Sequence, residues 1–405
     1  MRVVYAGEEF PRVWSKAIFL AGPTPRDTNT LSWRPEALRI LEAKGFDGVV
    51  FVPECADGKW KNSYDDQVKW EDEGLNFADC ILFWIPRDLA TMPALTTNHE
   101  HGEWFKSGKI VLGAPKTAAK MEYLLLKAAE NSVPLSETLE GTIAAALTHI
   151  GPGAEREDGE RYIPIHLWRT KSFWEWLAAV RLAGNRLEHA RVHYAYFMKR
   201  PERPIFMWAI RAGIWVQSEN RVKTENVISR PDTASVLLFH RNGELLDTEI
   251  VLVREVRVAA ATSDGYVWEL PSGSSHNPAE DLLTVALKEV EEETGLKLER
   301  ARLRTHECRQ LMATLSAHKS LLFVGEITAD EIAALKAEAG KAHGVAADGE
   351  RTFVEIRTLR EIIRENLVDW ATVGMISSAL LSDFSSAANL TYPVRSLFSY
   401  DPLVG

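Results

Sequence analysis

Short apolar runs alternate with helix-like segments through the first 150 residues, and this alternation constrains the fold more than any other feature of the chain. Each run is about five residues long, a length that is typical of strands and short for a buried helix. Strands separated from one another by helices indicate a parallel sheet with helices on both faces. The predicted strands cover residues 17–21, 48–52, 80–84 and 109–113, and the predicted helices cover residues 33–44, 65–78 and 99–106.

The segments that follow the predicted strands are the expected binding region, because ligands of such sheets gather beyond the carboxyl ends of the strands. Gly22, Pro23 and Arg26 directly follow the first strand, and we predict that they bind substrate. Arg26 and Arg34 would either bind a 5′-phosphate or form surface ion pairs, and both interpretations stay open. The remaining segments of this kind are residues 53–54, 86–87 and 96–102.

Farther along the chain, three acids lie on one side of a predicted helix. Glu289, Glu292 and Glu293 are spaced i, i+3 and i+4, which brings their carboxylates within reach of one another. Like charges this close destabilise a helix unless a cation lies among them, and hard divalent ions such as Mg²⁺ take oxygen ligands beside phosphates. Gly295 predicts the end of the helix. The alternative is a solvated acidic helix face.

The segment around these glutamates resembles the Nudix box, which reads G-x5-E-x7-R-E-U-x-E-E-x-G-U, where U is aliphatic. Gly273, Glu280 and the three glutamates match it, with two departures. Six residues rather than five separate Gly273 from Glu280, and Lys288 replaces an arginine, so a point charge replaces a planar fork. The resemblance implies an α/β/α domain with a mixed sheet that hydrolyses a nucleoside diphosphate linkage. It also implies that the three glutamates and Ser272 hold Mg²⁺ or Mn²⁺. Glu293 would in addition be a catalytic residue.

The strands before the box resemble those of ADP-ribose pyrophosphatases, in which an arginine-bearing strand precedes the sequence E-L-P-A-G. The strand that ends at Arg257 and the strand that contains Glu269 match this pattern, so the resemblance implies that both residues bind substrate. Some of these enzymes use a glutamate well after the box as the base that activates water. Glu350 matches best by position and Asp348 nearly as well, and for either one a solvated loop acid is the alternative.

Four short motifs of the N-terminal part lie at residues 19–23, 32–36, 67–71 and 98–102. Over about residues 15 to 125 they resemble the nucleoside 2-deoxyribosyltransferase family, particularly its divergent branch, which implies a flavodoxin-like sheet. The nucleophile of that family is a glutamate in an E-x-G turn that opens a helix, and Glu100 with Gly102 matches it. Glu71 aligns with an aspartate that contacts the nucleobase. Asn98 lies near the sugar-binding acid of the family but is not acidic.

The chemistry suits two acids in one site. A carboxylate can attack the anomeric carbon, displace a nucleobase and hold the sugar as an ester, while a second acid helps the base leave. We predict these roles for Glu100 and Glu71; the alternative for Glu100 is a cap at a helix start, where negative charge is favoured. For Asp79, substrate binding and a turn or cap are equally supported. His99 and His101 flank Glu100, and a structural role is favoured for His101.

Composition limits the class of protein. The 405 residues are 46% apolar and have a net charge of −10, with acidic and basic residues well mixed. A nucleic-acid partner is not expected because no basic stripe is present, and no apolar run approaches the ~20 residues that span a bilayer. The three cysteines form neither a disulfide framework nor a zinc pattern, which favours a cytoplasmic location. Nucleosides or nucleotides are the expected partners, and the transferase resemblance implies a homodimer or higher homo-oligomer.

The clearest predicted boundary is a polar, glycine-rich stretch at residues 151–160. It separates an N-terminal domain of residues 1–150 from a linker and helical connector of residues 151–202, with helices expected at 172–184 and 185–198. The Nudix domain with a C-terminal extension then covers residues 203–405. No motif in the connector has an evident chemical role, so we expect it to dock the two domains or to pair subunits.

These features together predict a bifunctional enzyme of nucleotide metabolism. The N-terminal domain would cleave or transfer at an N-glycosidic bond, and the C-terminal domain would hydrolyse a diphosphate with a divalent metal. Two alternatives stay open: an ADP-ribose sensor that regulates the first domain, and a nucleotide-depleting defence effector. A pure binder has no need of three clustered carboxylates, and two independent motif matches disfavour a purely structural protein.

Overall fold

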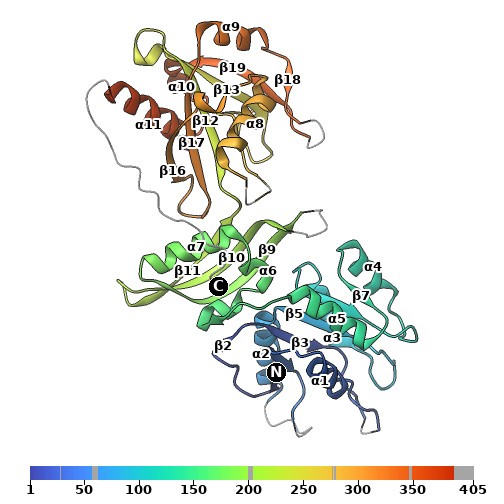
Figure 1. Ribbon diagram of the computed structural model, residues 1–405. Coiled ribbons are helices and arrows are strands. Elements are labelled where there is room, and N and C mark those ends of the chain that lie inside the picture. The colour runs from blue at the N-terminus through green and yellow to red at the C-terminus, as the bar shows by residue number, and fades with distance from the viewer. Residues whose placement is uncertain are drawn as a thin grey trace. The chain divides into compact units, whose positions relative to one another are not determined.

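The computed structural model describes residues 1–27, 29–56, 63–198, 204–275, 277, 280–345 and 349–386, with only the backbone of residues 383–386. The chain divides at Val227 and Ile228 into two compact units, which Figure 1 draws in ribbon form. Both units are α/β, as predicted. Among the described residues, no helix combines the length and the apolar character that crossing a membrane requires.

The first unit contains a six-stranded parallel sheet in the order β1-β4-β3-β5-β6-β7. From β4 to β7 this order is flavodoxin-like, which confirms the predicted fold class. All four predicted strands are present, and each is buried along its whole length because helices cover both faces. The strands are β1 (Arg2–Tyr5), β3 (Ala17–Ala21), β4 (Val49–Val52), β5 (Cys80–Trp84), β6 (Ile110–Gly113) and β7 (Leu135–Ser136).

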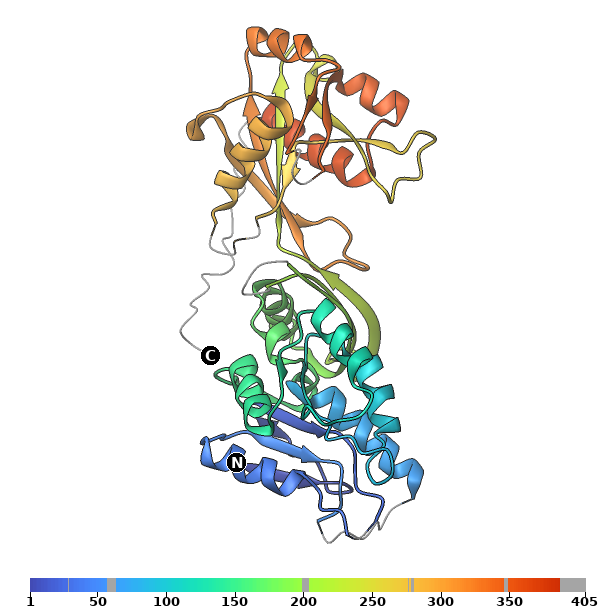
Figure 2. The same ribbon diagram turned by 90° about the vertical axis from the view of Figure 1, so that its right-hand side faces the viewer.

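The helices of this part form two layers (Figures 1 and 2). Helices α1 (Arg34–Ala43) and α5 (Leu139–Ile150) pack on one face of the sheet. The other face is covered by α2 (Tyr64–Phe77), α3 (Leu95–Trp104) and α4 (Glu122–Glu130). Helix α3 begins four residues before the predicted start at residue 99 and ends two residues before the predicted end at 106.

The prediction of a second helix at residues 185–198 is wrong, because this segment is the strand β9 (Arg186–Phe197). It pairs antiparallel with β10 (Ile205–Val216), which in turn pairs with β11 (Arg221–Ser229). Valine and aromatic residues in the segment favour a strand, and the pairing with β10 outweighs its weak helical pattern. The helix predicted at 172–184 is confirmed as α7 (Lys171–Leu182), after the short α6 (Ile165–Trp168).

The predicted connector shares a hydrophobic core with the parallel sheet. Phe173 of α7, Leu187 of β9 and Trp208 of β10 lie in one buried cluster with Ile18 and Val50 of the sheet. Strands β9 and β10 therefore belong to the first unit, and the division between the units lies at residue 227 rather than at 150 or 203.

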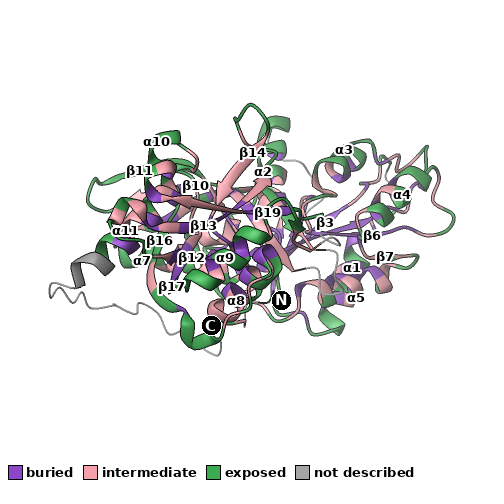
Figure 3. Ribbon diagram, turned by 90° about the horizontal axis from the view of Figure 1, so that it is seen from above, coloured by how far each residue is buried: buried purple, intermediate pink, exposed green. Residues whose placement is uncertain are grey.

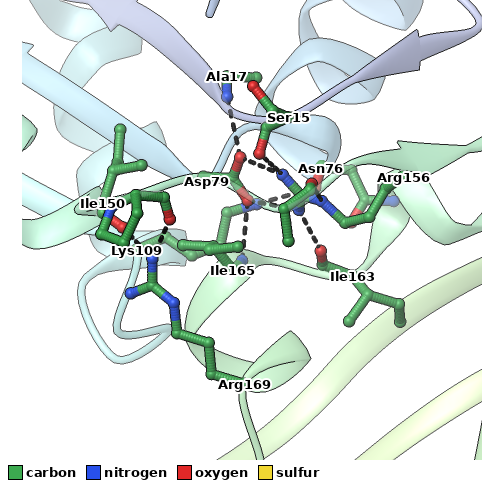
Figure 4. A network of polar contacts seen from close by, with 12 residues as sticks. Ser15, Ala17, Asn76, Asp79, Lys109, Ile150, Arg156, Ile163, Ile165 and Arg169 are labelled. Carbon is green, nitrogen blue, oxygen red and sulfur yellow. Dashed lines mark hydrogen bonds and ion pairs between the residues drawn. The ribbon is translucent and has the colours of Figure 1, made fainter. Parts of the chain in front are cut away.

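The glycine-rich stretch at 151–160 is also bound to the sheet domain. Strand β8 (Arg156–Glu157) pairs with β2 (Val13–Trp14), and the 3-10 helix η1 (Asp158–Tyr162) follows. Arg156 is completely buried and forms an ion pair with Asp79, which precedes β5 (Figure 4). The stretch is therefore a packed part of the unit and not a linker.

The second unit is built on an eight-stranded mixed sheet, as predicted. Its main path is β16-β17-β12-β13-β19-β18, in which β12 lies parallel to β17 and antiparallel to β13. The two remaining strands pair with β13 and β12. The strands are β12 (Thr233–His240), β13 (Glu249–Val256), β14 (Tyr266–Glu269), β15 (Ser272–Gly273), β16 (Arg304–Gln310), β17 (Lys319–Glu326), β18 (Ala342–His343) and β19 (Thr352–Thr358).

Helices cover both faces of this sheet, and Figure 3 colours the ribbon by how far each residue is buried. Helices α8 (Leu282–Thr294) and α9 (Ala329–Ala337) pack on one face, and α10 (Leu359–Glu365) and α11 (Trp370–Ser386) pack on the other. Gly295 ends α8 in the left-handed conformation, so the predicted helix end is confirmed. Two 3-10 turns, η2 (Leu245–Asp247) and η3 (Arg300–Arg302), complete the unit.

Candidate active sites

A cavity of about 480 Å³ opens at the carboxyl ends of β3 and β4. The chain runs from β3 to β4 on one side of β3 and then from β4 to β5 on its other side, which makes this the position at which open α/β sheets bind ligands. Gly22, Pro23 and Arg26 follow β3 in its wall, as the sequence predicts, and Arg26 is exposed at the rim. Further residues of the wall are Arg34, Pro53, Gln67, Glu71, Pro93, Thr97 and Glu100.

The floor of the cavity requires glycine at position 22. Gly22 has φ +151°, a conformation that residues with a side chain rarely adopt. A Cβ atom there would lie 2.2 Å from the carbonyl oxygen of Trp84 and 2.8 Å from the ring of Trp33. Only glycine therefore lets the end of β3 pack this closely against Trp33 and Trp84.

Glu100 lies in the second turn of α3 and faces the cavity. The helix begins at Leu95 with Ala94 as its N-cap, so Glu100 is not a cap at a helix start, and neither does it open the helix as the family motif describes. Burial and, after it, the charge of Glu71 raise the pKa of Glu100 to about 7, although Arg34 opposes the shift. The carboxyl group is therefore poised to change ionisation near neutral pH.

Glu71 shares the cavity with Glu100 and comes from α2. Its carboxylate accepts a hydrogen bond from the side-chain amide of Gln67, one turn earlier on the same helix. Burial raises the pKa of Glu71, and the hydrogen bond from Gln67 and the charge of Arg34 lower it. Two acids that interact in one site titrate as a pair. One of them then keeps its proton and can act as an acid, while the other is ionised and can act as a base.

Arg34 is 1% exposed, so it neither forms an ion pair at the surface nor is open to a phosphate group. Its Nε donates to the carbonyl oxygen of Leu20 at 3.1 Å, and its Nη2 donates to that of Gly22 at 2.7 Å. Nη1 donates to the hydroxyl of Thr24 and forms an ion pair with Glu54. The guanidinium thus holds the strand end of β3 in place beneath the cavity.

Glu54 is a residue whose role the sequence does not indicate. Its two carboxylate oxygens accept hydrogen bonds from the hydroxyl of Ser32 at 3.0 and 2.9 Å, in addition to the ion pair with Arg34. Only its position after β4 marks it in the sequence. The pairing with a residue 20 positions earlier follows from the parallel order of β3 and β4.

Asp79 does not line the cavity. Its carboxylate accepts hydrogen bonds from both Nη atoms of Arg156 and from the backbone amides of Ala17 and Ile165, at 2.6 to 2.8 Å (Figure 4). Because these four bonds occupy both oxygens in the core, the structure favours a structural role over the predicted substrate binding.

Asn98 and the two histidines beside Glu100 also lie outside the cavity wall. The side-chain oxygen of Asn98 accepts a hydrogen bond from Arg87. His99 is exposed, whereas His101 is buried against the rings of Phe83 and Phe105. Burial lowers the pKa of His101 to about 4, so its ring is a neutral part of the core, as favoured from the sequence.

In the second unit, α8 holds the three glutamates of the Nudix-like segment beside β15. Glu293 is 4% exposed, and its Oε2 accepts a hydrogen bond from the backbone amide of Ser272 at 3.1 Å. A Cβ atom on Gly273 would lie 1.8 Å from Oε1 of Glu289, so only glycine leaves room for that carboxylate. Ser272 and Gly273 therefore position two of the glutamates through their main chain.

These acids repel one another electrostatically. Burial, together with the charges of Glu292 and Glu350, raises the pKa of Glu289 to about 7. Burial also raises the pKa of Glu293 well above its usual range, and Glu289 adds to the shift. A cation among them would restore the ionised forms.

Arg257 and Glu269, both predicted to bind substrate, bind each other at the edge of this acidic cluster. The Nη2 atom of Arg257 lies 2.7 Å from Oε2 of Glu269 and 2.9 Å from Oε2 of Glu255. Glu255 is a member of the cluster that sequence reasoning missed. Burial raises the pKa of Glu255, Arg257 lowers it, and Glu269 and Glu350 raise it.

Glu350 is exposed on the loop before β19, close enough to Glu289 and Glu255 to raise the pKa of each. The loop is attached to the end of α8, where the backbone amide of Gly344 donates to the carbonyl oxygen of Glu292 at 2.8 Å. Asp348, the alternative base, lies outside the described residues.

The lysine that replaces the arginine of the motif keeps an ionic partner. Lys288 forms an ion pair with Glu280, whose carboxylate also accepts a hydrogen bond from the hydroxyl of Ser275. Both ends of the loop between Gly273 and Glu280 therefore contact α8, in spite of the extra residue.

The donor set fits a hard divalent cation in its chemistry. In the part of the chain that the structure describes, no three His, Cys, Asp or Glu side chains converge closely enough to hold one metal ion. The ligand atoms of Glu289, Glu292 and Glu293 are nevertheless all carboxylate oxygens, which Mg²⁺ and Mn²⁺ prefer. The raised pKa values of Glu289 and Glu293 are what uncompensated carboxylates would show.

Comparison with known families finds two domains in the chain. The family model described as nucleoside 2-deoxyribosyltransferase like matches residues 15–118, which include Glu71 and Glu100. The NUDIX domain model matches residues 229–339, which include the three glutamates of α8 but not Glu350. No curated protein matches the chain. NUDIX domains generally use divalent metal ions. The chain is a fusion of a nucleoside 2-deoxyribosyltransferase-like domain with a NUDIX domain, as expected of a protein of nucleotide metabolism.

Proposed function

We propose that the first unit cleaves or transfers at the N-glycosidic bond of a nucleoside or nucleotide, with Glu100 as nucleophile. The observation that supports this best is the presence of Glu100 and Glu71 in one cavity at the carboxyl ends of the strands, both with raised pKa values. The two carboxyl groups titrate as a pair, and the proposed reaction starts from the form in which Glu100 is ionised and Glu71 carries the proton.

In the proposed mechanism, the ionised carboxylate of Glu100 attacks the anomeric carbon as the bond to the base breaks. The electron pair of that bond leaves with the base, which takes the proton of Glu71. Glu71, now ionised, accepts a proton from water or from an incoming base, and this nucleophile attacks the anomeric carbon and releases Glu100. Whether the product is a free sugar or a new nucleoside depends on which nucleophile enters.

Arg26 is the cation that we propose for a 5′-phosphate. It is exposed at the rim of the cavity, while its backbone amide donates to the carbonyl oxygen of Thr91 at 3.0 Å and fixes the loop. Arg34 is excluded from this role by its buried contacts. A substrate with a phosphate at the 5′ position is therefore favoured over a free nucleoside.

For the second unit we propose hydrolysis of an ADP-ribose-like diphosphate. Glu289, Glu292 and Glu293 would hold Mg²⁺ or Mn²⁺, which when bound neutralises phosphate charge and polarises the bond that breaks. Glu350 would accept the proton of the attacking water from its exposed loop. Arg257, fixed by two carboxylates, would orient the substrate from the edge of the cluster.

One experiment tests both units. The full chain is incubated with nucleosides, nucleotides and dinucleotides, with and without Mg²⁺, and the products are identified by mass. Glu100→Gln should abolish only base release, and Glu289→Gln should abolish only the metal-dependent formation of AMP from ADP-ribose. Base release that survives in Glu100→Gln would remove Glu100 from the mechanism. ADP-ribose that binds in calorimetry but is not cleaved with Mg²⁺ or Mn²⁺ would favour the sensor. A homo-oligomeric state stays a prediction, for which light scattering is the direct measurement.

A further inference from the structure

A second cavity, of about 520 Å³, lies at the other end of the parallel sheet in the first unit. Its wall includes the residues just before β6 and β7, whereas the proposed catalytic cavity follows β3 and β4, and the two share no described residue. We name it the aromatic cavity, after the rings in its wall: Trp104, Phe105, Tyr162, Tyr194, Tyr196 and Phe197.

The end of β9 closes this cavity by packing on the turn between α3 and β6. Gly108 in that turn has φ +75°, and a Cβ atom on it would lie 2.1 Å from the ring of Phe197. The turn therefore requires glycine both for its main-chain conformation and for the close contact. This tight packing indicates a defined wall rather than a loose gap between two segments.

The rings of the wall offer a stacking surface for a planar ligand. Tyr194 and Tyr196 alternate along β9, so their side chains lie on the same side of the strand. They are 48% and 47% exposed, although aromatic rings gain most from burial. Trp104 and Phe105 contribute rings from the end of α3. Stacking of a base on such rings does not depend on the identity of the base.

The charge of the wall favours an anion. Lys106, Lys109 and Arg191 face a single acid, Glu103, which pairs with Arg191 at 3.1 Å. The Nζ atom of Lys109 donates to the carbonyl oxygens of Leu75 and Asn76 at 2.7 and 2.8 Å, and burial lowers the pKa of Lys109 to about 7, so the exposed cations of the wall are Lys106 and Arg191. Lys106 and Arg191 have exposed side chains that can reach a phosphate.

From these observations we propose that the aromatic cavity binds a nucleoside monophosphate, whose base stacks on Tyr194 and Tyr196 and whose phosphate lies against Arg191 and Lys106. The ring surface selects for a base and the excess of cations selects for a phosphate. A free nucleoside would contact only the rings of the wall, and an inorganic anion would contact only its cations.

Helix α3 connects this cavity to the proposed catalytic cavity. Glu100 and Trp104 are four residues apart and therefore lie on the same side of the helix. Glu103, which lies between them, contributes to the raised pKa of Glu100. A phosphate that takes Arg191 from Glu103 would leave this acid unpaired on the helix, so the ligand would act as an effector of base release. This coupling rests on the proposed function of the first unit, but the binding itself does not.

The binding is tested by hydrogen exchange of the full chain in the Glu100→Gln background, with AMP as probe and with adenosine and inorganic phosphate as comparisons. AMP should protect residues 104–110 and 191–197, and Tyr194→Ser with Tyr196→Ser should weaken its binding about tenfold or more. Tyr123→Ser is the matched control, because Tyr123 is 70% exposed on α4 and lies outside the cavity wall.

Three outcomes would overturn the proposal: no protection of these two segments, equal protection by inorganic phosphate or by adenosine alone, or equal binding by the double tyrosine variant. The coupling has its own readout in the chain with Glu100 intact. There the double tyrosine variant should keep basal base release but lose its response to AMP. Absence of base release in every variant would contradict the proposed function, while the exchange result would still stand.

Discussion

The two Nη atoms of Arg156 each lie 2.6 Å from a carboxylate oxygen of Asp79, and neither side chain has any exposed surface. This pair joins the stretch after α5 to the start of β5, in the middle of the first unit. Arg156 also donates to the carbonyl oxygens of Ser15 and Ile163, so its donors are satisfied inside the core.

Removal of one partner of this pair should strongly destabilise the first unit. We expect Asp79→Ala to lower the free energy of unfolding by about 3–5 kcal/mol, because it leaves the Arg156 charge buried without a partner. Asp47→Ala, which breaks the exposed pair with Lys16, should cost less than about 1 kcal/mol. Urea unfolding measures both. Equal small effects would mean that the stretch at 151–160 is a loose linker after all.

Glu54 should set the pH dependence of the first unit through Arg34. Glu54→Gln removes a negative charge that partly neutralises the guanidinium, so Arg34 should lower the pKa of Glu100 more than it does now. Since the attacking carboxylate must be ionised, the fall of kcat/KM on the acid side of about pH 7 should move to lower pH. Glu36→Gln on the same α1, where Glu36 is exposed and paired with Arg39, is the control and should leave the profile unmoved. A profile of Glu54→Gln that moves to higher pH would contradict the assignment of Glu100 as nucleophile.

His101 should make the first unit sensitive to acid. Its pKa falls from the ordinary value of 6.5 to about 4 on folding, so between these values the unfolded chain binds the proton more tightly. Stability is therefore complete above pH 6.5 and declines as the pH falls toward 4, by about 2–3 kcal/mol. His101→Phe should remove this dependence, while His99→Phe, at an exposed position on the same helix, should retain it. Thermal unfolding between pH 4 and 7 distinguishes the two.

Gly273 should be essential to the second unit alone. Gly273→Ala places a Cβ atom 1.8 Å from Oε1 of Glu289, so the carboxylate must move away from the other metal ligands. We expect a loss of Mg²⁺-dependent hydrolysis of at least about a hundredfold, as for other displaced catalytic groups. Gly374→Ala on α11, where a Cβ atom has nothing within 4 Å, is the control. Base release by the first unit should be the same in both variants, and hydrolysis by Gly273→Ala at the normal rate would mean that catalysis does not need the Glu289 carboxylate in its place beside Gly273.

The sequence predicts most of the parallel sheet, because each buried strand is a continuous apolar run that the pattern makes visible. It fails at β9, where apolar, charged and aromatic residues are mixed without a clear period and the pairing with β10 decides for the extended form. In the candidate sites, too, local patterns reveal some residues and not others. Glu71 and Glu100 are predicted from local motifs, whereas the contacts of Glu54 with Arg34 and of Glu269 with Arg257 depend on neighbouring strands, which local spacing does not reveal.

The shared core of the first unit limits how evolution can recombine these parts. A crossover between genes at residue 150 would strip α6, α7 and β9 from the sheet domain and expose part of the buried cluster that they share with it. Bare apolar surface of this kind promotes aggregation, so such a chimaera would be selected against. A crossover that exchanges the NUDIX domain is tolerable only beyond the three-stranded sheet. Homologous fusions should therefore retain that sheet together with the N-terminal half.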